Sequence, residues 1–148
     1  MFRSILVGTD GSETAHSALV RAVELAAGLR ARLAIVSAYE PVSGPRLRGE
    51  QVMAPKDAQW AINPHDDVLA LLVRARVEAL DAGVASVETF ARQGDAADAI
   101  LDVAEEQSCD LIVVGNKGMT GAKRFLLGSV PNKVSHHAPC SVLIVRTT

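Results

Sequence analysis

The sequence predicts an α/β fold: an open, five-stranded parallel sheet with helices on both faces. Five short apolar runs alternate with four stretches whose apolar residues recur at helical spacing. The runs are continuous in Val, Ile and Leu, as in strands that are buried on both faces, and do not alternate between apolar and polar residues. Strands that alternate with helices are joined by right-handed crossovers, so neighbouring strands run parallel.

The first half of the chain contains two strands, a helix and an irregular segment. The run SILVG at 4–8 predicts a strand, and a helix follows at 12–30, where the Ser12 side chain can cap the first turn. The run RLAIVSAY at 32–39 predicts the second strand. Residues 40–63 contain three prolines and no apolar period, which predicts a long irregular connection, either a binding lid or a disordered segment.

The second half repeats the alternation of helices and strands. A helix is expected at 64–83, with Pro at its start and Gly at its end, and a strand at 87–92. Asp95 can cap the next helix, at 94–108. The remaining elements are then expected as a strand at 110–115, a short helix near 129–137 and a last strand at 141–146.

Composition restricts the class of protein. A chain of 148 residues, 49% of them hydrophobic, predicts a single domain over 1–148 with a sizeable core. A net charge of −2 and an aromatic content of 3% argue against nucleic acid as a partner. No apolar stretch approaches the ~20 residues that span a bilayer, and no signal-peptide pattern is present. We therefore expect a cytoplasmic protein with no membrane partner, whose Cys109 and Cys140 are reduced thiols.

Two unusual loops each follow a strand. In open α/β sheets, ligands bind beyond the carboxyl ends of the strands, where the winding direction switches. The loop GTDGSE, at 8–13, places the Asp10 carboxylate at the end of the first strand. A carboxylate there suits a sugar hydroxyl or a metal ion better than a phosphate; the alternative is a plain Asp-Gly turn with a helix cap.

The second loop, GNKGMTGAKRFLLGS at 115–129, suits phosphate. Gly115 and Gly118 can adopt positive φ and turn main-chain amides inward, and Gly128-Ser129 then opens a helix whose free N–H groups favour an anion. The alternative is a flexible connection between strand and helix. The chain has neither the GxGxxG fingerprint after its first strand nor a GxxxxGK[ST] loop, so neither a dinucleotide site nor a P-loop is indicated.

Together these residues resemble the nucleotide-binding branch of the universal stress protein (UspA-like) family. The family pattern is glycine, two residues, glycine, nine residues, then glycine with Ser or Thr, and it is complete here as Gly115, Gly118 and Gly128-Ser129. The stretches ILVGTDGSETA, DLIVVGNKG and VSHHAPCSVLIVR are also similar to the family. The resemblance covers essentially the whole chain apart from 40–63. It implies a flavodoxin- or Rossmann-like sheet of order 3-2-1-4-5 that binds an adenine nucleotide, ATP or cyclic AMP.

The resemblance also implies roles for single residues. Thr9 and Asp10 would approach the ribose and adenosine, and Asp10 would be the residue nearest any Mg²⁺ that accompanies ATP. The adenine would lie near Ser37 and Ala38, an assignment that rests on position along the second strand. The phosphates would be held by Gly115, Gly118, Gly128, Ser129 and the Val130 amide. Members of the family commonly form homodimers through the last strand, here 141–146.

The sequence favours binding over catalysis. No Ser/His/Asp set can be placed, and the histidines at 16, 65, 136 and 137 are expected to be structural or on the surface. ATP hydrolysis requires a positioned water, usually with Mg²⁺, and Asp10 is the only acidic residue that the pattern places at the site. We therefore expect a regulatory or signalling protein with no catalytic residues. The alternatives are a slow ATP-hydrolysing enzyme and a ligand-free interaction scaffold.

Overall fold

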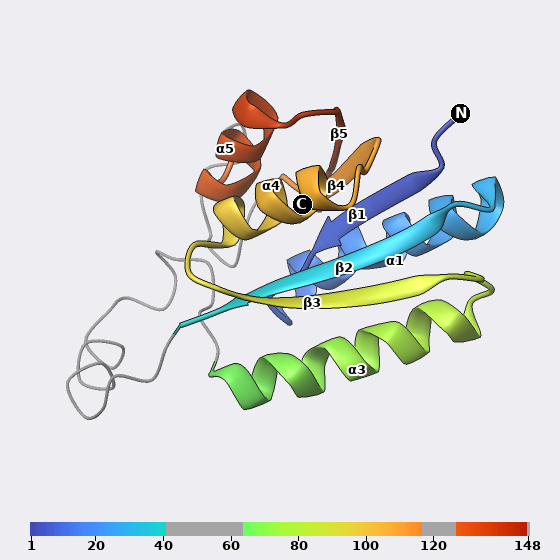
Figure 1. Ribbon diagram of the computed structural model, residues 1–148, viewed down its shortest axis with the longest axis horizontal. Coiled ribbons are helices and arrows are strands. Elements are labelled where there is room, and N and C mark those ends of the chain that lie inside the picture. Colours follow the sequence, from blue (N-terminus) through green and yellow to red (C-terminus); the bar gives the residue numbers. More distant parts are fainter. Residues whose placement is uncertain (41–63, 117–126, 148) are drawn as a thin grey trace.

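A computed structural model of the chain describes residues 1–40, 64–116 and 127–147. Their core is a five-stranded sheet of order β3-β2-β1-β4-β5 in which every pair of strands is parallel (Figure 1). The strands are β1 (Ser4–Gly8), β2 (Arg32–Tyr39), β3 (Val87–Gln93), β4 (Leu111–Gly115) and β5 (Ser141–Val145). The predicted fold class and strand order are confirmed.

Helices pack on both faces of the sheet (Figure 1). They are α1 (Glu13–Leu29), α3 (His65–Asp81), α4 (Ala96–Glu106) and α5 (Ser129–His137). Helices α1 and α3 cover one face, and α4 and α5 cover the other, so the core divides into two clusters. In β1, Ile5 and Val7 point into the first cluster and Leu6 into the second, each with 0% exposure. This two-sided burial explains why the strand sequences are continuous apolar runs.

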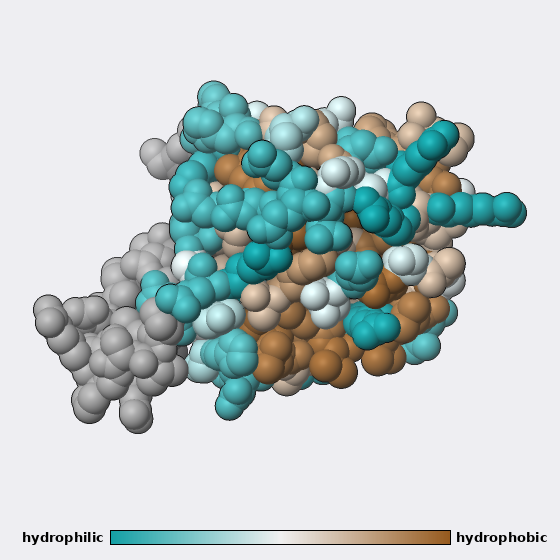
Figure 2. Space-filling view, in the orientation of Figure 1, coloured by the Kyte–Doolittle hydropathy of each residue, from teal (hydrophilic) through white to brown (hydrophobic). Residues whose placement is uncertain are grey.

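The outer face of α3 differs from that of an ordinary surface helix. Its inner face buries Val68, Leu72, Ala75 and Ala79, at helical spacing. A second apolar stripe lies on the solvent side, and Figure 2 shows apolar side chains gathered along the lower edge of the view, over α3. The exposed large apolar residues of this helix are Leu69, Val73, Val77 and Leu80. No described helix is long and apolar enough to cross a membrane.

Helix and strand boundaries differ from the sequence expectation by one or two residues. Ser12 and Asp95 stand outside their helices as N-caps with extended backbones, and their side chains accept bonds from Ala15 N and Asp98 N. Strand β4 begins at Leu111, one residue later than expected, and the Asp110 carboxylate just before it accepts from Arg3 N and Ser4 N. Of the irregular segment expected at 40–63, all but Glu40 lies outside the described residues.

Candidate functional site

The winding of the sheet reverses between β1 and β4. From β1 the chain proceeds to β2 and β3 on one side, whereas β4 and β5 lie on the other. Strands β1 and β4 are directly paired, with Ile5 opposite Leu111 and Val7 opposite Val113. The two loops singled out in the sequence therefore leave the sheet side by side, at the edge where the strands end, which we call the carboxyl edge. Ligands bind at this position in open α/β sheets.

The turn after β1 holds Asp10 in place. Thr9 N donates to Val36 O (2.9 Å), and Thr9 Oγ1 accepts from the N–H of Gly11 (3.2 Å), whose φ is +85°. Asp10 Oδ1 accepts from both Ser12 N (2.9 Å) and Ser12 Oγ (2.6 Å). Asp10 is only 4% exposed. The capped Asp-Gly turn that the sequence allowed as an alternative is present, and it fixes the carboxylate at the carboxyl edge.

The two ends of the second loop are joined by a backbone hydrogen bond. Gly115 is the last residue of β4 and pairs with Val145, and Asn116 N donates to Val145 O (2.9 Å). Gly128 N then donates to Asn116 O (2.9 Å). Gly115 therefore has the extended backbone of a strand, and the positive φ expected for it is wrong. Gly118 lies outside the described residues.

Helix α5 begins where this loop closes. Gly128 is its N-cap, with φ −64° and ψ 168°, and has no side chain with which to cap the first turn. The N–H groups of Ser129 and Val130 lie in that turn and have no partner within the helix, and Pro131 contributes no N–H. Two main-chain donors at the positive end of a helix dipole can bind an anion. The structure thus brings the second part of the glycine pattern close to the first.

Asn116 is a functional candidate that the sequence reasoning missed. Its side-chain Oδ1 accepts from Thr147 N (2.8 Å) and from Thr147 Oγ1 (2.8 Å). The main chain of the same residue bonds to Val145 and Gly128, so one residue connects β4, the segment after β5 and the start of α5. A single Asn after the last residue of a strand gives no spacing signal by which it could be found.

The end of β2 completes the carboxyl edge. Ala38 is 7% exposed and packs on the α4 side of the sheet. It lines a narrow recess that has no room for a water molecule, together with Gly8, Thr9, Val36, Ser37, Ala96, Ala99 and Ile100. A Cβ atom at Gly8 would lie 2.7 Å from Ile100 Cδ1, so a glycine is needed for β1 to approach α4 this closely. Ala38, predicted from position alone, does lie beside the Thr9 turn.

The histidines and acidic groups make contacts between elements. His16 Nε2 lies 2.8 Å from Glu78 Oε1, which links α1 to α3, and the His65 ring packs edge-on against Tyr39 at 4.6 Å between centroids. Lys133 pairs with Asp98 (2.8 Å) and Asp95 (3.4 Å), and the hydrogen bond that it donates to Asp98 raises the pKa of Lys133. The described residues contain no group of three or more His, Cys, Asp or Glu side chains arranged to hold a metal ion.

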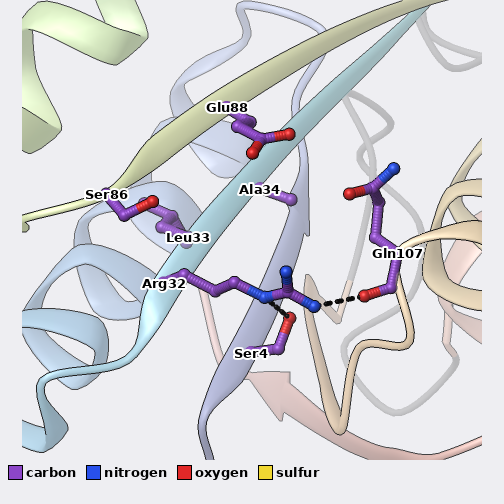
Figure 3. A pocket seen from close by; sticks show the side chains of 7 residues that line it. All are labelled: Ser4, Arg32, Leu33, Ala34, Ser86, Glu88 and Gln107. Atoms are coloured by element: carbon purple, nitrogen blue, oxygen red, sulfur yellow. Dashed lines mark hydrogen bonds between the residues drawn. The ribbon is translucent and has the colours of Figure 1, made fainter.

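At the opposite edge, where the strands begin (the amino edge), Arg32 bonds to Ser4 and to the main chain of Gln107 (Figure 3). The Arg32 guanidinium donates from Nε to Ser4 Oγ (2.9 Å) and also donates to the Gln107 carbonyl. Ser4 Oγ in turn donates to the Cys109 sulfur (3.6 Å). Cys109 and Cys140 are free cysteines, and burial raises the pKa of both thiols. These contacts favour a structural role for the amino edge.

The model of the universal stress protein family matches residues 1–146. The chain belongs to the universal stress protein family. Among curated relatives, a universal stress protein of Mycobacterium tuberculosis is 37% identical over 147 residues, covering 99% of this chain and 98% of the relative. YxiE, a universal stress protein of Bacillus subtilis, is 39% identical over 150 residues, covering 99% and 100%. The family resemblance seen in the sequence is confirmed.

Solved structures of the family have the same architecture. A universal stress protein in complex with cAMP superposes with a TM-score of 0.74 at 33% sequence identity, covering 99% of this chain and 98% of the other. The universal stress protein UspA from Lactobacillus plantarum gives a TM-score of 0.73 at 25% identity, covering 98% of each chain. The fold of this universal stress protein is therefore that of its relatives over nearly its full length.

Proposed function

We propose that this universal stress protein binds an adenine nucleotide, ATP or cyclic AMP, at the carboxyl edge between β1 and β4, and that it serves regulation or signalling. The observation that carries the proposal is the hydrogen bond from Gly128 N to Asn116 O. It brings the two ends of the glycine pattern together beside the Thr9-Asp10 turn, at the switch point of the sheet. A solved relative, 33% identical, is in complex with cAMP, which supports this class of ligand.

Each predicted residue has a role in the proposed site. The Thr9 backbone and the Asp10 carboxylate face the ribose, because the turn that holds them ends β1 at the switch point. The N–H groups of Ser129 and Val130 bind phosphate, because no side chain caps the first turn of α5. The adenine lies toward Ala38, and the glycines that allow close approach of the phosphates are Gly115, Gly118 and Gly128.

Binding fits the site better than turnover does. The Asp10 carboxylate, which would coordinate Mg²⁺ if ATP is bound with the metal, uses Oδ1 to accept two bonds from Ser12. A carboxylate oxygen that holds a turn together is poorly placed to position the water that attacks a phosphate. Slow ATP hydrolysis is the second candidate; the complete glycine pattern argues against a ligand-free scaffold.

We also propose that this single-domain, cytoplasmic protein forms a homodimer through the last strand, 141–146. Among the described strands, β5 pairs only with β4, so its outer edge presents N–H and C=O groups. The Leu143 side chain on this strand is 37% exposed. Pairing of β5 with its copy would satisfy the backbone groups and cover the apolar side chain. Sedimentation equilibrium tests the dimer, which Ile144→Pro should dissociate: Val145 O accepts from Asn116 N, so the N–H of Ile144, one residue earlier, points away from β4 to the outer edge.

Titration calorimetry tests the nucleotide proposal, with ATP and cyclic AMP each measured with and without Mg²⁺. We expect Asp10→Ala and Gly118→Ala to weaken the preferred ligand by about tenfold or more. Asp110→Ala is the matched control, since that carboxylate also binds backbone N–H groups but lies at the amino edge. Equal affinities for wild type, Asp10→Ala and Gly118→Ala would refute the site. Phosphate release above that of Gly118→Ala would establish the hydrolase instead.

A further inference from the structure

The outer face of α3 carries a contiguous apolar stripe. More than half of the large apolar side chains that are exposed in the described part of the chain lie on this helix, and we call them the outer stripe: Leu69, Val73, Val77 and Leu80. Helix α1 packs on the same face of the sheet, and none of its exposed residues is a large apolar one. Single exposed apolar residues are ordinary, whereas a contiguous group marks a contact surface (Figure 2).

The outer stripe has the same order of residues from either end. Its members are separated by four, four and three residues, so they are neighbours along one side of the helix. The order is Leu, Val, Val, Leu, and an antiparallel copy of the helix presents the same order. In an antiparallel pair, Leu69 of one copy faces Leu80 of the other. Val73 likewise faces Val77. Two copies related by a two-fold axis require this self-complementarity.

Charged residues beside the stripe fit the same arrangement. Arg74 and Asp81 lie about two turns apart on one flank of the stripe, and neither forms an ion pair within the described residues. Glu78 is the acidic residue one turn after Arg74, but it is paired with His16 of α1 (2.8 Å). Side chains tilt toward the N-terminus of their own helix, so in the antiparallel pair Arg74 leans toward Asp81 of the second copy and Asp81 toward Arg74. Opposite charges therefore meet twice, once on each side of the axis.

The surface beside the stripe has room for these contacts. An open hollow of about 660 Å³ on the same flank is lined by Val73, Arg74, Val77, Glu78, Asp81 and Ala82. The Arg74 side chain of a second copy would enter this hollow to reach Asp81. Helix α3 packs on β2 and β3, at the end of the sheet opposite β5. A contact through α3 therefore does not compete with the pairing of β5 proposed above.

We propose that a second copy of this chain packs antiparallel on α3, in the register that joins the two outer stripes. Each copy contributes the same surface, so the contact closes on itself and leaves no apolar stripe exposed. Arg76, on the other flank, meets its own copy near the two-fold axis, and this contact between like charges limits the affinity. An interface made by one helix from each copy is small, so it forms reversibly and depends on protein concentration.

Sedimentation velocity over a series of protein concentrations tests this contact with Val73→Lys. Val73 is 62% exposed, so the substitution leaves the core unchanged and places a charge at the centre of the interface. We expect association to weaken by about tenfold or more, and the largest assembly to lose half of its mass. Gly28→Lys is the matched control, since it adds the same charge on α1, where nothing lies within 4 Å of a Cβ, and should associate as wild type does.

A charge exchange tests the register. Arg74→Glu and Asp81→Lys, each alone, bring like charges together and should weaken association by about three- to tenfold. The double variant Arg74→Glu/Asp81→Lys again joins opposite charges and should recover most of the loss. Residues two turns apart on one helix do not touch, so this recovery arises between copies.

Two results would overturn the inference. Association of Val73→Lys equal to that of wild type, or a wild type that shows no association beyond the pairing of β5, would assign the outer stripe to a different protein. Loss of association in both single charge variants without recovery in the double variant would reject the antiparallel arrangement. Neither result bears on nucleotide binding, because α3 contributes no residue to the proposed phosphate or nucleoside contacts.

Discussion

Similar residues at the two edges of the sheet differ in their hydrogen bonding. Each edge has a buried serine and a carboxylate beside β1. At the amino edge, Ser4 bonds to Arg32 and Cys109, and Asp110 receives the N–H groups of Arg3 and Ser4. At the carboxyl edge, Ser37 has no partner among the described residues, and Asp10 is held by the turn that contains it. The polar groups of the amino edge therefore bond to one another, whereas the carboxyl edge, where we propose that the ligand binds, contains a buried hydroxyl without such a bond among the described residues.

The difference follows from where ligands can reach a parallel sheet. In open α/β sheets, ligands bind beyond the carboxyl ends of the strands where the winding direction switches, which in this sheet is between β1 and β4. At the other edge, the chain enters β4 from α4 through Asp110, whose carboxylate ties β4 to the start of β1. Substitutions at the amino edge should therefore change stability without changing binding, and substitutions at the carboxyl edge should affect both. Variants at both edges test this contrast.

The largest stability effect is expected for Asp110→Ala. Asp110 accepts from Arg3 N (2.9 Å) and Ser4 N (3.0 Å), and the variant leaves both donors without this partner. Loss of two charge-assisted bonds should lower the free energy of unfolding by about 2–3 kcal/mol, as urea denaturation would measure. Nucleotide affinity at 25 °C should not change. A weaker affinity would show that the two edges are coupled.

Gly8→Ala should destabilise the carboxyl edge by about 1–2 kcal/mol, because the new methyl group overpacks a closed contact. Its Cβ would lie 2.7 Å from Ile100 Cδ1 and 2.9 Å from Ile100 Cγ1. Gly28→Ala is the matched control, since nothing lies within 4 Å of a Cβ there, and should be neutral or slightly stabilising.

The cause of the Gly8 effect can be examined with Ile100→Val, which removes Cδ1, the nearer of the two clashing atoms. We expect the double variant Gly8→Ala/Ile100→Val to be more stable than the sum of the two single changes predicts. Thermal unfolding of all four proteins gives this coupling. Strict additivity would mean that the Gly8 effect does not arise from contact with Ile100 Cδ1.

Asn116→Ala should cost about 1 kcal/mol of stability through the lost bonds to Thr147. The Oδ1 atom accepts from both Thr147 N and Thr147 Oγ1, each at 2.8 Å. Because Asn116 also joins Gly128, we expect a few-fold loss of affinity for ATP and a smaller loss for adenosine, measured by calorimetry. Thr147→Val keeps the backbone bond and should show about half the stability loss. Equal losses for ATP and adenosine would contradict a role at the phosphate end.

The smallest effect is expected in the pH dependence of the free energy of unfolding that Asp110, at the amino edge, contributes. Burial disfavours the charged form of Asp110, but the N–H groups of Arg3 and Ser4 outweigh burial and hold the pKa of this carboxyl below its ordinary value of 3.8. A depressed pKa in the folded state stabilises the protein above the unfolded pKa and ceases to do so as pH falls through the folded value.

Comparison of wild type with Asp110→Asn tests the direction of this pKa shift. The stability difference between the two should be constant from neutral pH down to about pH 4 and should shrink at lower pH. Urea unfolding at a series of pH values measures the difference. A difference that grows below pH 4 would show that the folded state raises the pKa of Asp110.

Much of the fold could be predicted from the sequence because burial on two faces leaves a visible pattern. Continuous apolar runs marked the strands, and 3.6-residue spacing marked the helices to within two residues. Ser12 and Asp95 were correctly predicted as N-caps, since capping depends on a few neighbouring residues. The order of the strands came from the family resemblance, because periodicity does not specify which strands are neighbours.

The candidate site was only partly predictable. Thr9, Asp10, Ala38, Gly128, Ser129 and Val130 do lie at the carboxyl edge. The positive φ expected for Gly115 was wrong, because pairing with Val145 keeps its backbone extended. Asn116 was missed because its partners, Thr147 and Gly128, come from other parts of the chain. Hydrogen bonds between segments that are far apart in the chain leave no regular pattern in the sequence.

By itself, then, the sequence determined which segments form strands and helices and which two loops are unusual, since these depend on residues close together in the chain. Only the tertiary structure decided which polar groups find partners. Ser4 and Ser37 are both buried serines in strands, and nothing in their neighbouring residues distinguishes a bonded hydroxyl from an unbonded one. Arg32 on β2 and Cys109 after α4 form hydrogen bonds with the Ser4 hydroxyl. These residues come together only when the sheet assembles.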